Sequence, residues 1–395
     1  MNNTIYLDNA ATTRVKSEVW SAMQPYFEAQ YANPASSYTS AGEINAEVER
    51  ARQTIAAFLG AEAREIYFTG GGSESDNWAI KGVASALKAK GRHIITSKIE
   101  HHAVLRTCEY LEKNGCEVTY LDVDDKGFVD LEQLSAAIRP DTVLISIMFA
   151  NNEIGTIEPV KEISAIAHAH GVLFHTDAVQ AYGHVPINVN ELGIDLLSVS
   201  GHKINGPKGI GFLYIRNGVR IDPLIHGGSQ ERGKRAGTTN VPGIIGLAKA
   251  TELAAATMDA RSEYERKLRD HLIERVEREI PYVRLNGDRE RRLPNNTSFC
   301  FRFIEGESLL LLLDQFGICG SSGSACTSGS LDPSHVLLAI GLPHEIAHGS
   351  LRLTLSEENT KEEIDCTVDR LKKIVERLRS MSPLYEDFKK KEARQ

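Results

Sequence analysis

The sequence is poor in cysteine and in long apolar runs. Its 395 residues include six cysteines and no C-x-x-C pair, which is too few for a disulfide framework and lacks the spacing of a zinc site. We therefore expect no metal site. The longest run of leucines, Leu309–Leu313, is far shorter than the roughly 20 apolar residues that cross a membrane. The N-terminus lacks the basic start and apolar core of a signal peptide, so we expect a cytoplasmic protein.

The sequence also lacks an excess of positive charge. Lysine and arginine together number 45 against 53 aspartates and glutamates, which gives a formal net charge of -8. A protein that binds nucleic acid needs a basic face, so this balance argues against nucleic acid as a partner. The length exceeds what a single core comfortably fills and predicts two interdigitated domains.

From about residue 63 to 215, short β-branched runs alternate with longer helical patterns. The seven expected strands are Glu65–Thr69, His93–Ser97, Glu117–Leu121, Thr142–Met148, Val172–His175, Leu196–Val199 and Ile210–Ile215. Helices are expected between them, as over Ser73–Lys90, Asp130–Arg139 and Val160–His170. This alternation predicts an α/β fold with a mainly parallel sheet between helices. Ligands bind such sheets at the carboxyl ends of the strands.

The second part of the sequence has a different pattern. Two long helical patterns occupy about residues 240–278, and a smaller α+β unit follows. Its expected elements are strands over Tyr282–Leu285, Thr297–Phe303 and Leu351–Leu355, and helices over Gly306–Phe316 and Lys361–Arg379. The charged last dozen residues are expected to be solvated or mobile. We expect a large domain of residues 16–257 and a small domain formed by residues 1–15 and 258–395.

A glycine-rich turn follows the first expected strand of the sheet. Gly71 and Gly72 would let the backbone approach a ligand closely, and Ser73 opens the next helix. The N–H groups of a helix N-terminus can bind a phosphate group. A plain tight turn with a serine cap explains the same residues, so both interpretations stay open.

A carboxylate and a lysine follow two neighbouring strands. Asp177 lies in HTDAVQ and Lys203 lies in SGHKINGPKGIG. A carboxylate can keep a pyridine nitrogen protonated, and a partly desolvated lysine can form a Schiff base with a carbonyl group. The alternatives are that Asp177 caps a helix, and that Lys203 and Lys208 are surface lysines.

Three further side chains have two interpretations each. Cys326 stands among small residues in SSGSACTSG, which leaves its sulfur accessible and favours a reactive thiol. Cys300, between two phenylalanines, and Cys319 are expected to be structural. Arg352, within an apolar strand, could bind a carboxylate, but a strand arginine more often faces solvent. His101 is either a loop cap or a ring that stacks on a cofactor.

The motifs together resemble those of the cysteine desulfurases, in the class V branch of fold-type I enzymes that use pyridoxal 5'-phosphate (PLP). The match runs in order from Tyr6 to about Lys389. The matching motifs are YLDNAAT (Tyr6–Thr12), ANPASS (Ala32–Ser37), SESDN (Ser73–Asn77), EHHAVL (Glu100–Leu105), NNEIG (Asn151–Gly155), HTDAVQ (His175–Gln180), SGHKINGPKGIG (Ser200–Gly211), RAGTTN (Arg235–Asn240) and SSGSACTSG (Ser321–Gly329).

The resemblance implies a role for each matching position. It assigns cofactor contacts to Gly72, Ser73, His101, Asn152, Asp177, Gln180, Ser200, His202, Lys203 and Thr238. Among these, Lys203 would carry PLP, Asp177 would pair with the pyridine nitrogen, and Thr238 would reach the phosphate of a neighbouring subunit. Asn152 and Arg352 would hold the substrate. The catalytic residues would be Lys203, His101 and Cys326, the last on a loop of the small domain.

The implied activity is PLP-dependent removal of sulfur from L-cysteine, which yields L-alanine and a persulfide on Cys326. The implied partners are a second copy of the chain and an iron–sulfur scaffold or another sulfur-acceptor protein. Selenocysteine lyase, class V aminotransferase and non-catalytic assembly scaffold remain as alternatives. Two positions depart from the common family pattern. Tyr38 stands where histidine is usual, and Ser73 stands where threonine is usual but keeps the hydroxyl group.

Overall fold

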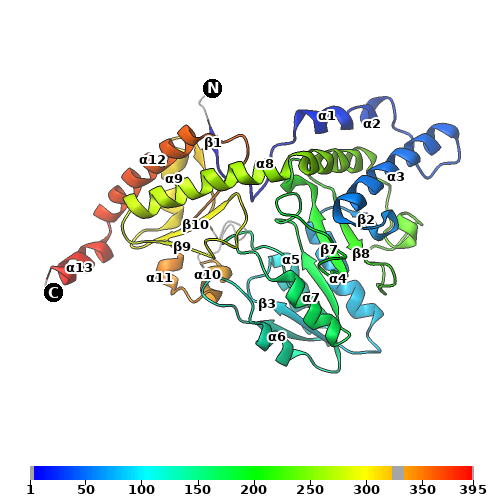
Figure 1. Cartoon of the computed structure of the whole chain (residues 1–395), viewed down its shortest axis with the longest axis horizontal. Coiled ribbons are helices and arrows are strands. Elements are labelled where there is room, and N and C mark those ends of the chain that lie inside the picture. Colours follow the sequence, from blue (N-terminus) through cyan, green and yellow to red (C-terminus); the bar gives the residue numbers. More distant parts are fainter. Residues whose placement is uncertain (1–3, 323–332, 394–395) are drawn as a thin grey trace.

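The computed structural model describes residues 4–322 and 333–393. The larger part of the chain is built on a sheet of seven strands in the order β2-β8-β7-β6-β5-β3-β4 (Figure 1). The strands are β2 (Ile66–Thr69), β3 (His93–Ser97), β4 (Glu117–Leu121), β5 (Thr142–Ser146), β6 (Leu173–Asp177), β7 (Leu196–Ser200) and β8 (Gly211–Ile215). β8 runs opposite to the other six strands of this sheet. The predicted α/β class with a mainly parallel seven-stranded sheet is confirmed.

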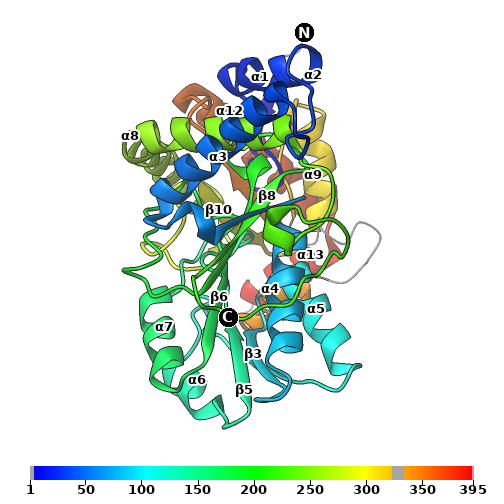
Figure 2. The same ribbon diagram turned by 90° about the vertical axis from the view of Figure 1, so that its right-hand side faces the viewer.

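Helices cover both faces of this sheet, because successive strand side chains point to opposite sides. The helices of this part are α1 (Ser17–Met23), α2 (Pro25–Glu28), α3 (Thr39–Leu59), α4 (Gly72–Ala86), α5 (His102–Glu112), α6 (Leu131–Ala137) and α7 (Val160–Ala169). Leu196 and Leu213 pack with α4 and α5 on one face. Leu197 and Phe212 pack with α3 and α7 on the other. Figure 2 shows α4 and α5 on one side of the strands and α6 and α7 on the other.

A second unit contains a smaller sheet in the order β12-β10-β9. Its elements are β9 (Val283–Leu285), β10 (Asn296–Phe301), β11 (Ile318–Cys319), β12 (Ser350–Thr354), α9 (Gly306–Asp314), α10 (His335–Ala339), α11 (His344–Ala347) and α12 (Lys361–Ser380). The N-terminal strand β1 (Ile5–Tyr6) pairs in parallel with β11, and Ile5 and Leu7 join the core of this unit. The predicted smaller α+β unit is therefore present, and the domain boundary at 257/258 stays a prediction.

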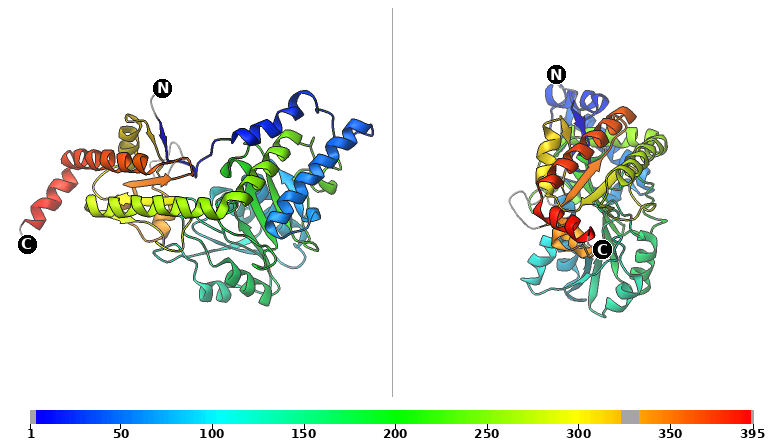
Figure 3. Two further views of the ribbon diagram at one scale, coloured as in Figure 1. Left: turned by 45° about the horizontal axis from the view of Figure 1, so that its top comes forward. Right: turned by 90° about the vertical axis from the view of Figure 1, so that its left-hand side faces the viewer.

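One helix, α8 (Val241–Glu279), replaces the two that the sequence pattern predicted. Its first half buries Ile244 and Leu247 in the core beside the large sheet. Its second half buries Leu272 and Val276 in the core of the smaller unit. The two predicted patterns are therefore two buried faces of one helix of 39 residues. Figure 3 shows α8 running along both parts of the molecule.

The charged C-terminal residues form a helix, which the sequence prediction did not include. This helix, α13 (Pro383–Glu392), places Phe388 against Phe303 with ring centroids 4.9 Å apart, and against Tyr282 at 5.2 Å. Aromatic contacts of this kind help to order the segment, although none of its residues is buried. Within residues 4–322 and 333–393, no helix is both long and apolar enough to cross a membrane.

Candidate active site

A cavity of about 670 Å³ lies at the carboxyl ends of β6 and β7. The predicted residues that line it are Gly72, Ser73, His101, Asn152, Asp177, Gln180, Ser200, His202, Lys203 and Arg352. Parallel topology explains this gathering, since the strand ends of such a sheet meet at one edge. Two predicted residues are not part of the lining described. Cys326 lies outside the described residues, and the exposed Thr238 does not line this cavity.

Lys203 presents its amine to the cavity from the turn after β7. That turn is a short 3-10 helix, η2 (Gly201–Lys203). The Lys203 Nζ donates hydrogen bonds to the carbonyl oxygens of Ala10 at 2.6 Å and Ala11 at 2.8 Å. The N-terminal segment thus holds the amine in place. Lys203 is half-buried, unlike the exposed Lys208, so the interpretation of Lys203 as a surface lysine is wrong.

Asp177 is the last residue of β6 and is buried, with 5% of its surface exposed. Its Oδ1 accepts a hydrogen bond of 2.9 Å from the Val179 amide. Residues 178–195 contain no helix, so Asp177 is not a helix cap. Burial raises the pKa of the Asp177 carboxyl, whereas nearby His101 acts in the opposite direction.

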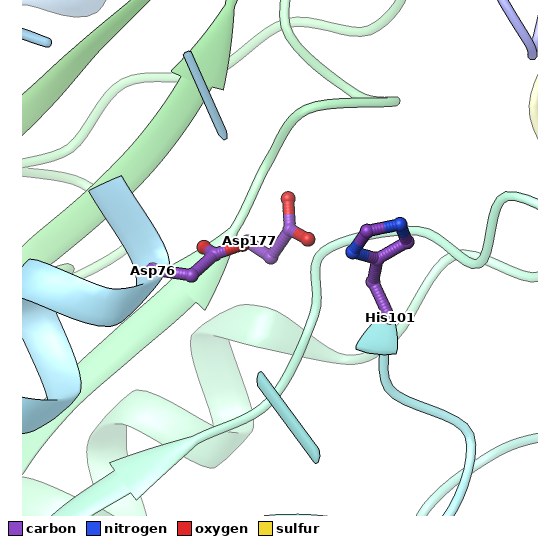
Figure 4. Close-up of side chains that lie close together, drawn as sticks. All are labelled: Asp76, His101 and Asp177. Atoms are coloured by element: carbon purple, nitrogen blue, oxygen red, sulfur yellow. The ribbon is translucent and has the colours of Figure 1, made fainter. Parts of the chain in front are cut away.

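A second buried carboxylate, Asp76 on α4, stands beside Asp177 and was missed from the sequence. Figure 4 shows Asp76, Asp177 and His101 side by side, and one polar atom from each lies within 4.8 Å of the others. Burial and the neighbouring Asp177 raise the pKa of Asp76 well above its usual range. The SESDN motif contains Asp76, but a polar residue within a helix gives no local sign of burial.

His101 is a helix cap that also lines the cavity, so the cap interpretation is confirmed and stacking on a cofactor stays a prediction. It precedes α5, and its Nδ1 accepts a hydrogen bond of 3.1 Å from the Ala103 amide. In the neutral ring the proton must then reside on Nε2. His101 also lines the cavity opposite Asp177. A ring whose orientation is fixed by a backbone hydrogen bond suits stacking and proton transfer.

The N-terminus of α4 forms another wall of the cavity. Gly71 has φ +147°, and a Cβ atom at Gly72 would come within 2.6 Å of the Val179 side chain. A residue with a side chain at position 72 would therefore collide with Val179. Ser73 and Ser200 bring hydroxyl groups to the same wall. Backbone amides at a helix N-terminus together with hydroxyls are suited to binding a phosphate group.

His202 lies next to Lys203 on the same turn. Its Nδ1 is 3.1 Å from the Thr12 Oγ1, which again ties the site to the N-terminal segment. Burial and the charge of Lys203 lower the pKa of His202 to about 4. The ring is therefore neutral near pH 7 and can act as a hydrogen-bond donor without adding charge.

Arg352 is buried in β12, with 4% of its surface exposed, so the solvent-facing alternative is wrong. Its Nη2 donates to the Asp8 carboxylate at 3.0 Å and its Nη1 donates to the Asn152 carbonyl at 3.1 Å. Its Nε has no hydrogen-bond partner among the described residues. A guanidinium held in this way at a cavity wall can still bind a carboxylate. Asp8, within the YLDNAAT motif, was not predicted.

The residues present fit a phosphorylated pyridine aldehyde. The cavity has a lysine amine, a buried carboxylate pair and a helix N-terminus, and Oδ1 of Asp76 has no hydrogen-bond partner among the described residues. A buried pair of carboxyl groups calls for a cation or a proton donor nearby. Gln180, whose Nε2 donates to the Ala10 carbonyl at 3.0 Å, completes the polar lining.

The sheet order and the lysine after β7 define a fold-type I, PLP-dependent transferase. The chain belongs to the aminotransferase class-V family, which it matches over residues 5–366. Cysteine desulfurase IscS of Clostridium botulinum (strain Hall) is 57% identical over 392 residues, covering 99% of this chain and 99% of that protein. The predicted resemblance to cysteine desulfurases is confirmed.

Solved structures agree with this assignment. A NifS-like protein has a TM-score of 0.89 and 41% identity, covering 94% of this chain and 99% of that one. SspA in complex with cysteine has a TM-score of 0.80 and 38% identity, covering 90% of this chain and 100% of that one.

Proposed function

We propose that this protein is a PLP-dependent cysteine desulfurase, an enzyme that takes sulfur from L-cysteine and releases L-alanine. The observation that carries the proposal is the convergence of the Lys203 amine, the buried Asp177 carboxylate and the Arg352 guanidinium on one cavity. Cysteine desulfurases at 57% identity over nearly the whole chain support the same activity.

Residues on three sides would hold the cofactor: Lys203, Asp177 and the α4 N-terminus with its neighbouring hydroxyl groups. PLP supplies an electron sink that makes the Cα proton and the side chain of an amino acid labile. Lys203 Nζ anchors the cofactor covalently and, once the amino acid has replaced it, removes the Cα proton. Asp177 holds the proton of the ring nitrogen. The α4 N-terminus, with Ser73 and Ser200, binds the phosphate.

The amino acid would be oriented from the opposite wall. Arg352 binds the substrate carboxylate, and its contacts to Asp8 and Asn152 hold the guanidinium in place. The solved SspA complex with cysteine, at 38% identity, supports cysteine as the ligand. His101 Nε2 is placed to donate or accept a proton near the substrate.

Cys326 would accept the sulfur. Its thiolate attacks the substrate sulfur, so that an S–S bond forms while the C–S bond breaks. The carbon fragment keeps the electron pair of the broken bond, takes up a proton and leaves as L-alanine. The product on the chain is a Cys326 persulfide, which passes to an acceptor such as an iron–sulfur scaffold protein.

The dimer, the domain boundary and the cellular location belong to the same proposal. The working unit is a homodimer, in which Thr238 reaches the phosphate site of the neighbouring subunit. Supporting this, Thr238 is exposed and does not line the cavity of its own chain. The large domain spans residues 16–257 and the small domain residues 1–15 and 258–395, and the enzyme works in the cytoplasm.

The test is product analysis with PLP-loaded protein, L-cysteine and a reducing thiol. We expect alanine and sulfide in equal amounts. A class V aminotransferase would instead form a 2-oxo acid from the amino acid and release no sulfide. A selenocysteine lyase would act on selenocysteine and leave cysteine almost unchanged, and a non-catalytic scaffold would yield no product. Any of these three results would overturn the proposal.

A further inference from the structure

Asp76 and Asp177 form a buried carboxyl pair on two different elements of the fold. Asp76 projects from α4 with 1% of its surface exposed, and Asp177 ends β6 with 5% exposed. Their side chains approach each other within the 4.8 Å that also includes His101 (Figure 4). Two carboxylates this close and this poorly solvated cannot both remain charged, so the pair keeps one proton.

The groups around Asp177 favour its charged form. His101 and Lys203 both stabilise a negative charge there, and the Val179 amide donates to its Oδ1 at 2.9 Å. Lys203 belongs to the turn after β7 and His101 precedes α5, so this support comes from two different elements of the fold.

The groups around Asp76 favour its neutral form. Burial and the neighbouring Asp177 raise the pKa of Asp76 most, and Glu100 adds to this effect, whereas Ser198 acts in the opposite direction. His175 Nε2 lies 3.7 Å from the Asp76 Oδ1. Burial lowers the pKa of His175 to about 3, so this ring offers no positive charge.

Asp76 lies beside a polar network across three strands. His175 on β6 connects Ser146 on β5, 2.8 Å from its Nδ1, with Ser198 on β7, 2.9 Å from its Nε2. The network lies next to Asp76 through His175 and supplies no positive charge that could balance a carboxylate there.

We propose that Asp76 keeps the single proton of this pair and is a positioning residue that leaves Asp177 as the charged member of the pair beside the cofactor. The proposal rests on the proposed function, because it concerns how Asp177 is prepared for PLP. Asp76 acts through Asp177 and takes no part in the chemistry of the substrate.

Infrared spectroscopy of protein labelled with carbon-13 at the aspartate carboxyl groups tests this directly. In cofactor-free protein near pH 7 we expect one band of a protonated, buried aspartic acid. The Asp76→Asn variant should lose this band. The Asp177→Asn variant should still show the band at low pH. As pH rises, the band should disappear at a lower pH than in the wild type, because the neighbouring negative charge no longer raises the pKa of Asp76. A band that survives in Asp76→Asn and is missing in Asp177→Asn would place the proton on Asp177 and overturn the proposal.

A measurement on the unaltered chain covers the case in which a variant does not fold. The aspartic acid band should persist after the labelled wild-type protein is saturated with PLP, because Asp76 keeps its proton while Asp177 faces the ring. Loss of the band on loading would contradict the proposal. Neither result depends on cysteine turnover, so failure of the proposed activity would be recognised separately by product analysis.

Discussion

Arg352 and Asp8 are joined by a hydrogen bond of 3.0 Å between Nη2 and Oδ1, although 344 residues separate them in the chain. The bond holds the guanidinium at the wall of the cavity, where it would bind the substrate carboxylate. In Arg352→Lys the planar pair of donors is lost. We expect KM for L-cysteine to rise roughly 10- to 100-fold, since a hydrogen bond to a charged group is worth about 1.5–3 kcal/mol.

Steady-state kinetics of Arg352→Lys against Arg284→Lys measure this effect. Arg284 lies on β9 and does not line the cavity, so its variant should keep the wild-type KM. An unchanged KM in Arg352→Lys would show that Arg352 does not bind the substrate carboxylate.

Lys203→Ala should remove both turnover and the visible absorption band of the bound cofactor, because the anchoring amine is gone. Borohydride reduction of the loaded wild type, followed by peptide mapping, should place the pyridoxyl group on Lys203. Lys208 also lines the cavity and is the natural control. A pyridoxyl group found on Lys208 would show that the wrong lysine was chosen.

Cys326→Ser should still bind PLP and shift its absorption on addition of cysteine, yet form almost no sulfide or alanine. A serine hydroxyl is far less nucleophilic than a thiolate near pH 7. Mass spectrometry of the cysteine-treated wild type should find about 32 Da added, one sulfur atom, on the Cys326 peptide. Cys319→Ala is the matched control and should keep turnover. Wild-type turnover in Cys326→Ser would make the protein a different PLP lyase.

Mixed dimers test whether Thr238 serves the neighbouring subunit. Lys203→Ala and Thr238→Val chains should each bind PLP poorly in their own homodimers. A mixed dimer should contain one complete site, because its Lys203 and its Thr238 then come from different chains. Titration with PLP should recover tight binding in about half of the subunits. If mixing recovers none, Thr238 has no role across the interface.

The buried carboxyl group of Glu158 should make the free energy of unfolding depend on pH. Glu158 has 3% of its surface exposed, and burial raises its pKa to about 8. The folded chain therefore holds a proton that the unfolded chain releases at a much lower pH. The free energy of unfolding should fall as pH rises toward 8, by on the order of 1 kcal/mol per pH unit for such a group.

Glu158→Gln cannot ionise, so denaturant unfolding of this variant between pH 6 and 8 should show a flatter decline than the wild type. Glu162→Gln, at an exposed position, is the control and should follow the wild type. A decline in Glu158→Gln as steep as that of the wild type would show that Glu158 is already ionised in this range.

The strands and the catalytic edge of the sheet could be predicted from the sequence because their signals are local. The β-branched runs identified β3 and β4 to the residue, and parallel topology then brought Asp177 and Lys203 to one edge. A glycine-rich turn before a helix likewise predicted the wall at Ser73.

Contacts between distant parts of the chain could not be predicted in this way. Arg352 is held by Asp8 at the other end of the chain, and the raised pKa of Asp76 depends in part on Asp177, a residue about 100 positions away. The single helix α8 was read as two because it packs against two cores in succession. In each case the structure depends on residues that are distant in the sequence, and the local sequence pattern does not reveal such contacts.

The pairing of β1 with β11 has a consequence for the order of events during synthesis. Ile5 pairs with Ile318 across these two strands. Ala10, a few residues further on, accepts a hydrogen bond from Lys203. At the usual pace of translation, roughly 5–20 residues per second, Ile5 waits about 15–60 s for its partner strand to emerge. The seven-stranded sheet can assemble in that interval, but the wall that holds the lysine amine cannot. The nascent chain thus acquires its scaffold first and its completed cofactor site only near the end of translation.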